Sequence, residues 1–133
     1  MSRYMLDSNI AGEFLPKRSA LRDRAKKLIK SGHRVGIAAP VVGELYGGAQ
    51  YSSTRERNLN ALDRELERWL VWPFDLNAAY EYGRLYAMLR RAGRPIQHID
   101  TQIAAIALSI GDSIGVTRDS DFTAIPELRC EAW

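Results

Sequence analysis

Four carboxylates of this chain lie at positions where they could bind a cation or act on a phosphate ester. Asp7 and Asp119 each follow a short apolar run with the character of a strand. Glu44 and Asp100 lie near the starts of helical segments. In an open α/β sheet, side chains that follow strands or open helices gather at the carboxyl edge, where ligands bind. The four acids are therefore expected to meet at one edge of a sheet.

Carboxylates that converge without basic partners repel one another, so the pKa of some of them rises unless a cation is bound. The chain has one cysteine, Cys130, and two isolated histidines, His33 and His98, which gives no zinc pattern. Hard oxygen ligands favour Mg²⁺, with Mn²⁺ as the alternative. Magnesium keeps several waters and pairs with phosphate, so such a site is suited to hydrolysing a phosphate ester.

Each acid taken alone also has a structural explanation. A strand over residues 4–6 leads to a helix that runs from Ile10 toward Pro16, and Ser8 or Asn9 is expected to cap it. Asp7 itself is an equally good cap. The set is harder to explain in this way, because glutamate is not a favoured cap and Asp100 introduces a very apolar helix.

The remaining pattern predicts alternating helices and strands. The helices are predicted over residues 19–31, 40–46, 53–70, 76–92 and 99–108, the last almost wholly apolar and therefore central. Strands are predicted over residues 34–38, 71–74 and 113–116, with a short one within 128–133. Pro73 indicates an edge strand, and Asp75 is interpreted as a helix cap. This alternation predicts an α/β three-layer sandwich, with a mostly parallel central sheet flanked by helices.

Length and composition predict one soluble domain over residues 1–133. The chain is 46% hydrophobic, which is enough for a sizeable core. No apolar run approaches the roughly 20 residues of a membrane span, and Arg3 and Asp7 stand where a signal peptide needs apolar residues. A cytoplasmic protein is therefore expected. Neither Cys130 nor Ser8 has a His–acid relay for nucleophilic catalysis.

The positive charge is unevenly distributed, although the net charge is only +3. Residues 17–34 include eight Lys or Arg residues and one acid, and residues 82–99 include a second group of arginines. Such groups could bind the phosphates of a nucleic acid. The clustering is explained equally well if these residues only form the solvated faces of helices. The candidate phosphate contacts are Arg22, Lys26, Lys27, Arg90, Arg91 and Arg94.

Several motifs together resemble a PIN domain, and more narrowly the VapC toxins of bacterial toxin–antitoxin pairs. They are Leu-Asp-Ser-Asn at 6–9, Pro-Val-Val-Gly-Glu-Leu at 40–45, Trp-Pro-Phe-Asp-x-x-Ala-Ala at 72–79, Asp100 before Ile-Ala-Ala at 103–105, and Val-Thr-Arg-Asp at 116–119 with Asp-Phe at 121–122. The similarity extends over essentially the full length. It has two departures: Ser8 stands where threonine is more usual, and the last motif offers two acids.

The resemblance implies a magnesium-dependent endoribonuclease that leaves a 5′ phosphate and a 3′ hydroxyl. The implied metal and catalytic residues are Asp7, Glu44, Asp100 and Asp119, with Asp121 as a further candidate ligand. Glu44 would bind the metal through water or position the attacking water, and Asn9 and Thr117 would support the ligands by hydrogen bonds. The basic groups would then draw in the RNA backbone.

The implied partners are a transfer or ribosomal RNA, a VapB-type antitoxin and a second copy of the chain. The antitoxin would place an arginine in the acidic pocket. Exposed apolar groups near Phe14, Leu15 or Tyr46 are candidates for the surface that binds the antitoxin. The sequence does not locate that surface, and it does not identify the RNA.

Two other functions compete with this interpretation. Receiver and haloacid-dehalogenase-like phosphotransfer domains also place an aspartate after their first strand, but the phosphatase pattern needs a second aspartate where Asn9 stands. A non-catalytic RNA-binding module would keep the acids for structure alone. The presence of all four acids favours the nuclease.

Overall fold

The computed structural model describes residues 1–13 and 20–133. Its sheet has five strands in the order β3-β2-β1-β4-β5, and every strand pairing within the described residues is parallel. The strands are β1 (Arg3–Leu6), β2 (Arg34–Ala38), β3 (Leu70–Trp72), β4 (Ser113–Val116) and β5 (Arg129–Glu131). The predictions for Phe14 and Leu15 lie outside the described residues. The first helix was predicted to run from Ile10 toward Pro16, but it begins at Ser8 and ends at Gly12, with Glu13 as its C-cap.

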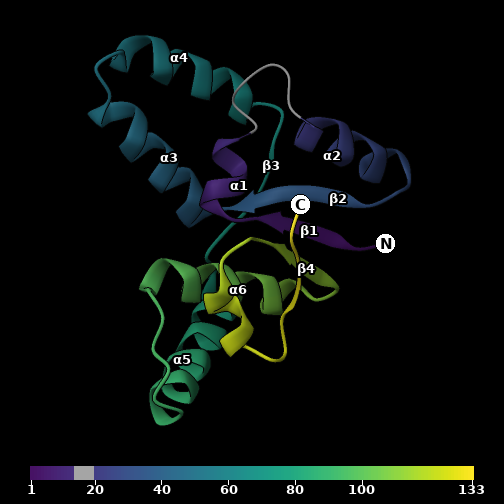
Figure 1. Ribbon diagram of the computed structural model, residues 1–133, viewed down its shortest axis with the longest axis vertical. Coiled ribbons are helices and arrows are strands. Elements are labelled where there is room, and N and C mark those ends of the chain that lie inside the picture. Colours follow the sequence, from purple (N-terminus) through teal and green to yellow (C-terminus); the bar gives the residue numbers. More distant parts are fainter. Residues whose placement is uncertain (14–19) are drawn as a thin grey trace.

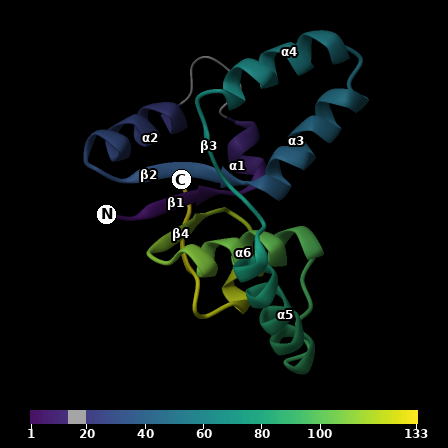
Figure 2. The same cartoon turned by 180° about the vertical axis from the view of Figure 1, so that it is seen from behind.

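Helices lie on both sides of this sheet, which confirms the predicted α/β sandwich. In both views α2, α3 and α4 lie to one side of β1 and β2, and α5 and α6 lie to the other (Figures 1 and 2). The helices are α1 (Ser8–Gly12), α2 (Ala20–Lys30), α3 (Ala39–Tyr51), α4 (Arg55–Leu66), α5 (Leu76–Arg91) and α6 (His98–Ile110), with a 3₁₀ helix η1 (Ser120–Ala124). Where the chain is described, none of these helices has the length and apolarity needed to cross a bilayer.

The first strand runs through the middle of the sheet, and α6 is the most buried helix. Met5 and Leu6 of β1 are each 1% exposed, as expected for a parallel strand covered on both faces. On α6 the buried residues are Thr101, Ile103, Ala104, Ala105, Ile106 and Ala107. This burial confirms the predicted central position of the apolar helix, and it fixes the first turn of α6 next to the carboxyl ends of β1 and β4.

Two later helices also differ from the prediction at their ends. The helix predicted over residues 53–70 is α4, which ends at Leu66 because the next residues turn and Leu70 already pairs in β3. The helix that begins near Pro40 continues through Gly47 and Gly48 to Tyr51. Residues 71–74 were predicted as an edge strand, and β3 does lie at an edge of the sheet.

Gly36 of β2 lies where two backbones approach closely, so Gly36→Ala is expected to destabilise the protein by about 1–3 kcal/mol. A Cβ at this position would overlap the carbonyl oxygen of Leu70 in β3. Gly115→Ala in β4 is the matched control, since its Cβ would make ordinary contacts of 3.5 Å or more. Urea unfolding of both variants tests this expectation, and equal midpoints would contradict it.

Candidate active site

A hollow of about 200 Å³ opens at the carboxyl edge of the sheet and brings the predicted acids together. Its walls come from the end of β1, the first turns of α1 and α6, the second turn of α3, and the segment after β4. The lining residues are Asp7, Ser8, Asn9, Glu44, Gln97, Ile99, Asp100 and Asp119. We call this hollow the acidic site. None of these residues is basic.

Asp7 is buried at the acidic site, with only 6% of its surface exposed. One carboxylate oxygen accepts a hydrogen bond from the backbone N–H of Ile10 at 2.9 Å, so Asp7 is the N-cap of α1. Of the two alternatives for this cap, Asp7 is therefore confirmed, and the prediction that Ser8 or Asn9 caps the helix is wrong. Capping does not exclude metal binding, because an ionised carboxylate has about four acceptor positions.

Thr117 joins two of the acids through its hydroxyl group. The hydroxyl donates to the second carboxylate oxygen of Asp7 at 2.5 Å and accepts from the backbone N–H of Asp119 at 2.9 Å. Thr117 is itself buried. Both acids are thus held in fixed positions at the ends of adjacent parallel strands.

Glu44 reaches the acidic site from the first turns of α3. Pro40 lies at the start of that helix, and the exposed Glu44 side chain accepts a hydrogen bond from the hydroxyl of Ser8. This contact orients one carboxylate oxygen of Glu44. Asn9, the other predicted supporting residue, lines the same hollow with an exposed side chain.

Asp100, Asp119 and Asp121 form the tightest group of acids. One carboxylate oxygen from each lies within 4.8 Å of the others. Burial and, after it, the charges of Asp119, Asp121, Glu44 and Asp7 in that order together raise the pKa of Asp100 to about 6. A carboxyl group that is hard to ionise among four other acids gains most from a bound cation.

The donor set fits a divalent cation with a preference for oxygen. Carboxylates dominate the lining, and neither a cysteine nor a histidine belongs to it. Small hard cations such as Mg²⁺ take carboxylate oxygens together with water. The acidic site can therefore concentrate a cation and place it against a phosphate group.

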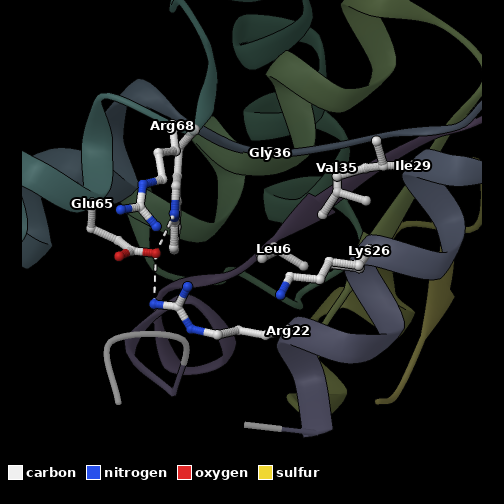
Figure 3. A pocket seen from close by; sticks show the side chains of 10 residues that line it. Leu6, Arg22, Lys26, Ile29, Val35, Gly36, Glu65 and Arg68 are labelled. Atoms are coloured by element: carbon white, nitrogen blue, oxygen red, sulfur yellow. Dashed lines mark hydrogen bonds and ion pairs between the residues drawn. The ribbon is translucent and has the colours of Figure 1, made fainter. Parts of the chain in front are cut away.

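Two of the basic residues predicted on α2, Arg22 and Lys26, line another hollow and not the acidic site. Arg22 forms an ion pair with Glu65 of α4 at 2.7 Å, and Glu65 also accepts from the indole of Trp69 (Figure 3). Arg22 and Lys26 line a separate, mainly apolar hollow between α2 and α4. Lys27 is exposed on α2.

The second basic group lies around the end of α5. Arg90 lines a third hollow together with Tyr86 and His98, on the far side of the first turn of α6. Arg91 and Arg94 are exposed. Arg90 therefore lies beside His98 and Thr101 of α6, the helix that also contributes Asp100 to the acidic site.

Two polar residues of the site were not assigned to it from the sequence. Gln97 lies directly before α6 and lines the hollow, and Ser8 binds Glu44. The signal for Gln97 was its position three residues before Asp100. Ser8 was predicted as a cap, a role that Asp7 takes instead.

The sequence pattern of the PIN domain matches residues 4–128. The chain belongs to the PIN-domain family. Among relatives, the tRNA(fMet)-specific endonuclease VapC of Shigella flexneri is 33% identical over 133 residues, covering all of this chain and 99% of the relative. Ribonuclease VapC2 of Rickettsia felis is 28% identical over 98% of this chain and 97% of its own length.

Solved structures of PIN-domain complexes have the same fold. VapBC2 of Rickettsia felis bound to a promoter DNA fragment has a TM-score of 0.89 at 29% identity, with 98% of each chain covered. DNA-bound VapBC of Salmonella typhimurium also has a TM-score of 0.89, at 32% identity over 100% of this chain and 99% of that one. These matches confirm the resemblance to VapC-type PIN domains, and they favour the nuclease over a phosphotransfer domain.

Proposed function

We propose that the chain is a toxin-type endoribonuclease that hydrolyses RNA phosphodiesters at the acidic site with Mg²⁺, or Mn²⁺ in its place. The observation that carries the proposal is the clustering of Asp100, Asp119 and Asp121 oxygens within 4.8 Å, beside Asp7 and Glu44. The full-length similarity to relatives named as VapC ribonucleases supports RNA as the substrate.

Asp7, Asp100 and Asp119 would hold the metal, with Asp121 as a further ligand. Burial and hydrogen bonds orient Asp7, and the backbone N–H of Asp121 donates to Asp119 at 2.9 Å. When bound, the cation would polarise the phosphate as a Lewis acid and would lower the pKa of the water that attacks it. Asp7 caps α1, Asp100 lies in the first turn of α6 and Asp119 caps η1. The packing of these three helices therefore sets the spacing of the three carboxylates.

Glu44 would orient the attacking water, and the neutral side chains would bind the phosphate. Glu44, oriented by Ser8, accepts a hydrogen bond from the attacking water and sets its direction. The amides of Asn9 and Gln97 are the neutral donors at the rim, and they can bind a phosphate oxygen without adding charge. The products would carry a 5′ phosphate and a 3′ hydroxyl.

The partners follow from the same family. The Shigella relative is named for a transfer RNA, and the similar solved structures are VapBC complexes. We propose a structured cytoplasmic RNA, transfer RNA or ribosomal RNA, as substrate, a VapB-type antitoxin as inhibitor and a homodimer as the working form. We also propose that residues 1–133 make one folding unit.

The direct test is cleavage of total RNA by the purified chain, freed of any antitoxin. Cleavage is expected with Mg²⁺ and is expected to stop with EDTA, and sequencing of the new ends should find 5′ phosphates. Persistent cleavage in EDTA would contradict the metal mechanism. Stable phosphorylation of Asp7 by acetyl phosphate would instead establish a phosphotransfer domain.

Thr117→Val is expected to lower cleavage about 10- to 100-fold, as removal of a group that orients metal ligands typically does. The change takes a hydrogen-bond partner from both Asp7 and Asp119, so unfolding should also become easier by about 1–3 kcal/mol. Thr117→Ser keeps the hydroxyl and is the control. Steady-state cleavage rates and urea unfolding measure the two effects, and equal behaviour of the valine and serine variants would refute the role.

Asp119→Asn is expected to reduce cleavage at least about 100-fold, and Asp121→Asn by about tenfold or less. Asp119 lines the acidic site together with Asp7, Glu44 and Asp100, whereas Asp121 joins the cluster from outside that lining. Asparagine caps as well as aspartate, so η1 should persist in Asp119→Asn. Cleavage assays with circular dichroism compare the two variants, and a larger loss for Asp121→Asn would reverse the assignment.

A further inference from the structure

Three aromatic rings lie together on the side of α6 away from the acidic site. Tyr82 and Tyr86 come from α5, and His98 is the first residue of α6. Their ring centroids are 6.2–6.3 Å apart in every pairing, and their planes differ by 9–27°. We call these three rings the aromatic raft.

The first turn of α6 separates the aromatic raft from the acidic site. Residues of this turn that line the acidic site are Gln97, Ile99 and Asp100. Residues that line the neighbouring hollow of about 200 Å³, together with Tyr86 and Arg90, are Ile96, His98 and Thr101. A helix with its side chains is about 10 Å across, so a single strand that crosses this turn reaches both places within about one or two nucleotides.

The orientation of the raft is fixed before any ligand arrives. The hydroxyl of Tyr82 and Nδ1 of His98 share a hydrogen bond of 2.5 Å, which joins α5 to α6. Phe74 packs edge-on against Tyr82, with centroids 6.0 Å apart. Tyr86 nevertheless remains 40% exposed. Rings held in this way lose little conformational freedom when another flat group stacks on them.

A cation accompanies the rings. The guanidinium of Arg90 lies 5.2 Å from the centroid of the Tyr86 ring. Aromatic side chains that stack bases, next to positive charge that follows the backbone, are the general means by which proteins bind single-stranded nucleic acid. The acidic site alone repels a polyanion, so an attractive surface beside it is needed for RNA to approach.

We infer that the aromatic raft stacks an unpaired base of the RNA next to the phosphodiester that is cleaved, while Arg90 contacts the adjacent phosphate. The inference rests on the proposed ribonuclease function and adds positioning residues to it. Joining α5 to α6 explains why Tyr82 is half-buried, but it does not explain why Tyr86 and His98 are exposed beside a cation.

The first experiment compares Tyr86→Ala with Tyr80→Ala. Tyr80 lies on the same helix, is 74% exposed and is outside the raft, so it is a matched control. Affinity for a single-stranded RNA of mixed sequence is measured by fluorescence anisotropy in EDTA, where cleavage is blocked. Tyr86→Ala is expected to bind about 5- to 150-fold more weakly, and Tyr80→Ala and Tyr86→Phe to bind as the unmodified chain does.

The second experiment reports stacking directly. In Tyr86→Trp, the new indole should be quenched when the same RNA is added, whereas the indole of Tyr80→Trp should not be. With Mg²⁺, Tyr86→Ala should raise KM by a factor similar to the loss of affinity, with little change in kcat. If Tyr86 only joined α5 to α6, Tyr86→Ala would change the melting temperature but not KM, and RNA would not quench the indole of Tyr86→Trp.

The results of these experiments distinguish a failure of the raft inference from a failure of the proposed ribonuclease function. If the chain cleaves RNA but Tyr86→Ala keeps its KM and Tyr86→Trp is not quenched, the raft inference fails and the function stands. If RNA binds and quenches Tyr86→Trp but is never cleaved, the function fails and the raft is a binding site only. A change from dimer to monomer in Tyr86→Ala, with RNA affinity unaltered, would make the raft a protein interface and overturn the inference.

Discussion

Asp100→Asn is expected to lower RNA cleavage at least about 100-fold, and at the same time to raise the melting temperature of the metal-free protein at neutral pH. The loss of cleavage follows from removing a charged ligand at the centre of the acid cluster. The gain in stability follows from removing a charge that burial and four neighbouring acids disfavour. Opposite effects of one substitution on activity and stability would mark a site that is built for function at a cost to the fold.

The sign of the stability effect depends on pH. The pKa of Asp100 rises from 3.8 to about 6 on folding, so between these values the folded chain binds more protons than the unfolded one. The contribution of this carboxyl group to stability is therefore fully present below about pH 4 and is lost as pH rises through about 6. The melting temperatures of Asp100→Asn and the unmodified chain should differ at pH 7 and converge near pH 4.

The control for this comparison is Asp112→Asn. Asp112 is exposed in the turn between α6 and β4, has a positive φ of 45° that asparagine also tolerates, and is not part of the acidic site. Cleavage and melting temperature should be nearly unchanged in this variant. Full cleavage by a folded Asp100→Asn protein would remove Asp100 from the mechanism.

The second large effect expected is on metal binding. Mg²⁺ should bind about tenfold more weakly at pH 5 than at pH 7.5, because a proton occupies Asp100 below its pKa of about 6 and must leave before the cation binds. Mg²⁺ at 100 times its dissociation constant should also stabilise the fold by about 2.7 kcal/mol at the higher pH. The weaker binding at pH 5 should reduce that gain.

Titration calorimetry at the two pH values measures the affinity, and thermal unfolding with and without Mg²⁺ measures the stabilisation. Asp100→Asn should show a smaller dependence on pH, since the titrating group is gone. Equal affinity of the unmodified chain at pH 5 and pH 7.5 would contradict the role given to this carboxyl group. Removal of the metal with EDTA should restore the lower melting temperature.

The elements that carry the acids were predictable, because their signals are local. The apolar run of β1 and the apolar helix α6 are recognisable from their residue types, and both lie in the core. The choice of cap for α1 was not local. The backbone N–H of Asp7 still bonds to Val116 of β4, so the extended conformation lasts one residue longer than the apolar run and Asp7, rather than Ser8, becomes the cap.

The surroundings of the acids depended on contacts between distant residues, which one sequence does not reveal. The ion pair of Arg22 with Glu65 places that arginine in another hollow, so the number of basic residues on α2 said little about where they face. Tyr82 and Tyr86 lie within the helix predicted over residues 76–92, and His98 was interpreted as an isolated histidine. Only the packing of α5 against α6 brings the three rings together.

The hydrogen bond between Asp7 and Thr117 joins residues that are 110 positions apart in the chain. During synthesis the amino-terminal part emerges first, and one oxygen of Asp7 can already accept the hydrogen bond from Ile10. The other oxygen gains its partner only when Thr117, which follows β4, has been made. The acidic site therefore stays incomplete on the ribosome until β4 and the residues after it, through Asp121, have been made and have folded against β1. Until then, cellular RNA cannot meet a finished site.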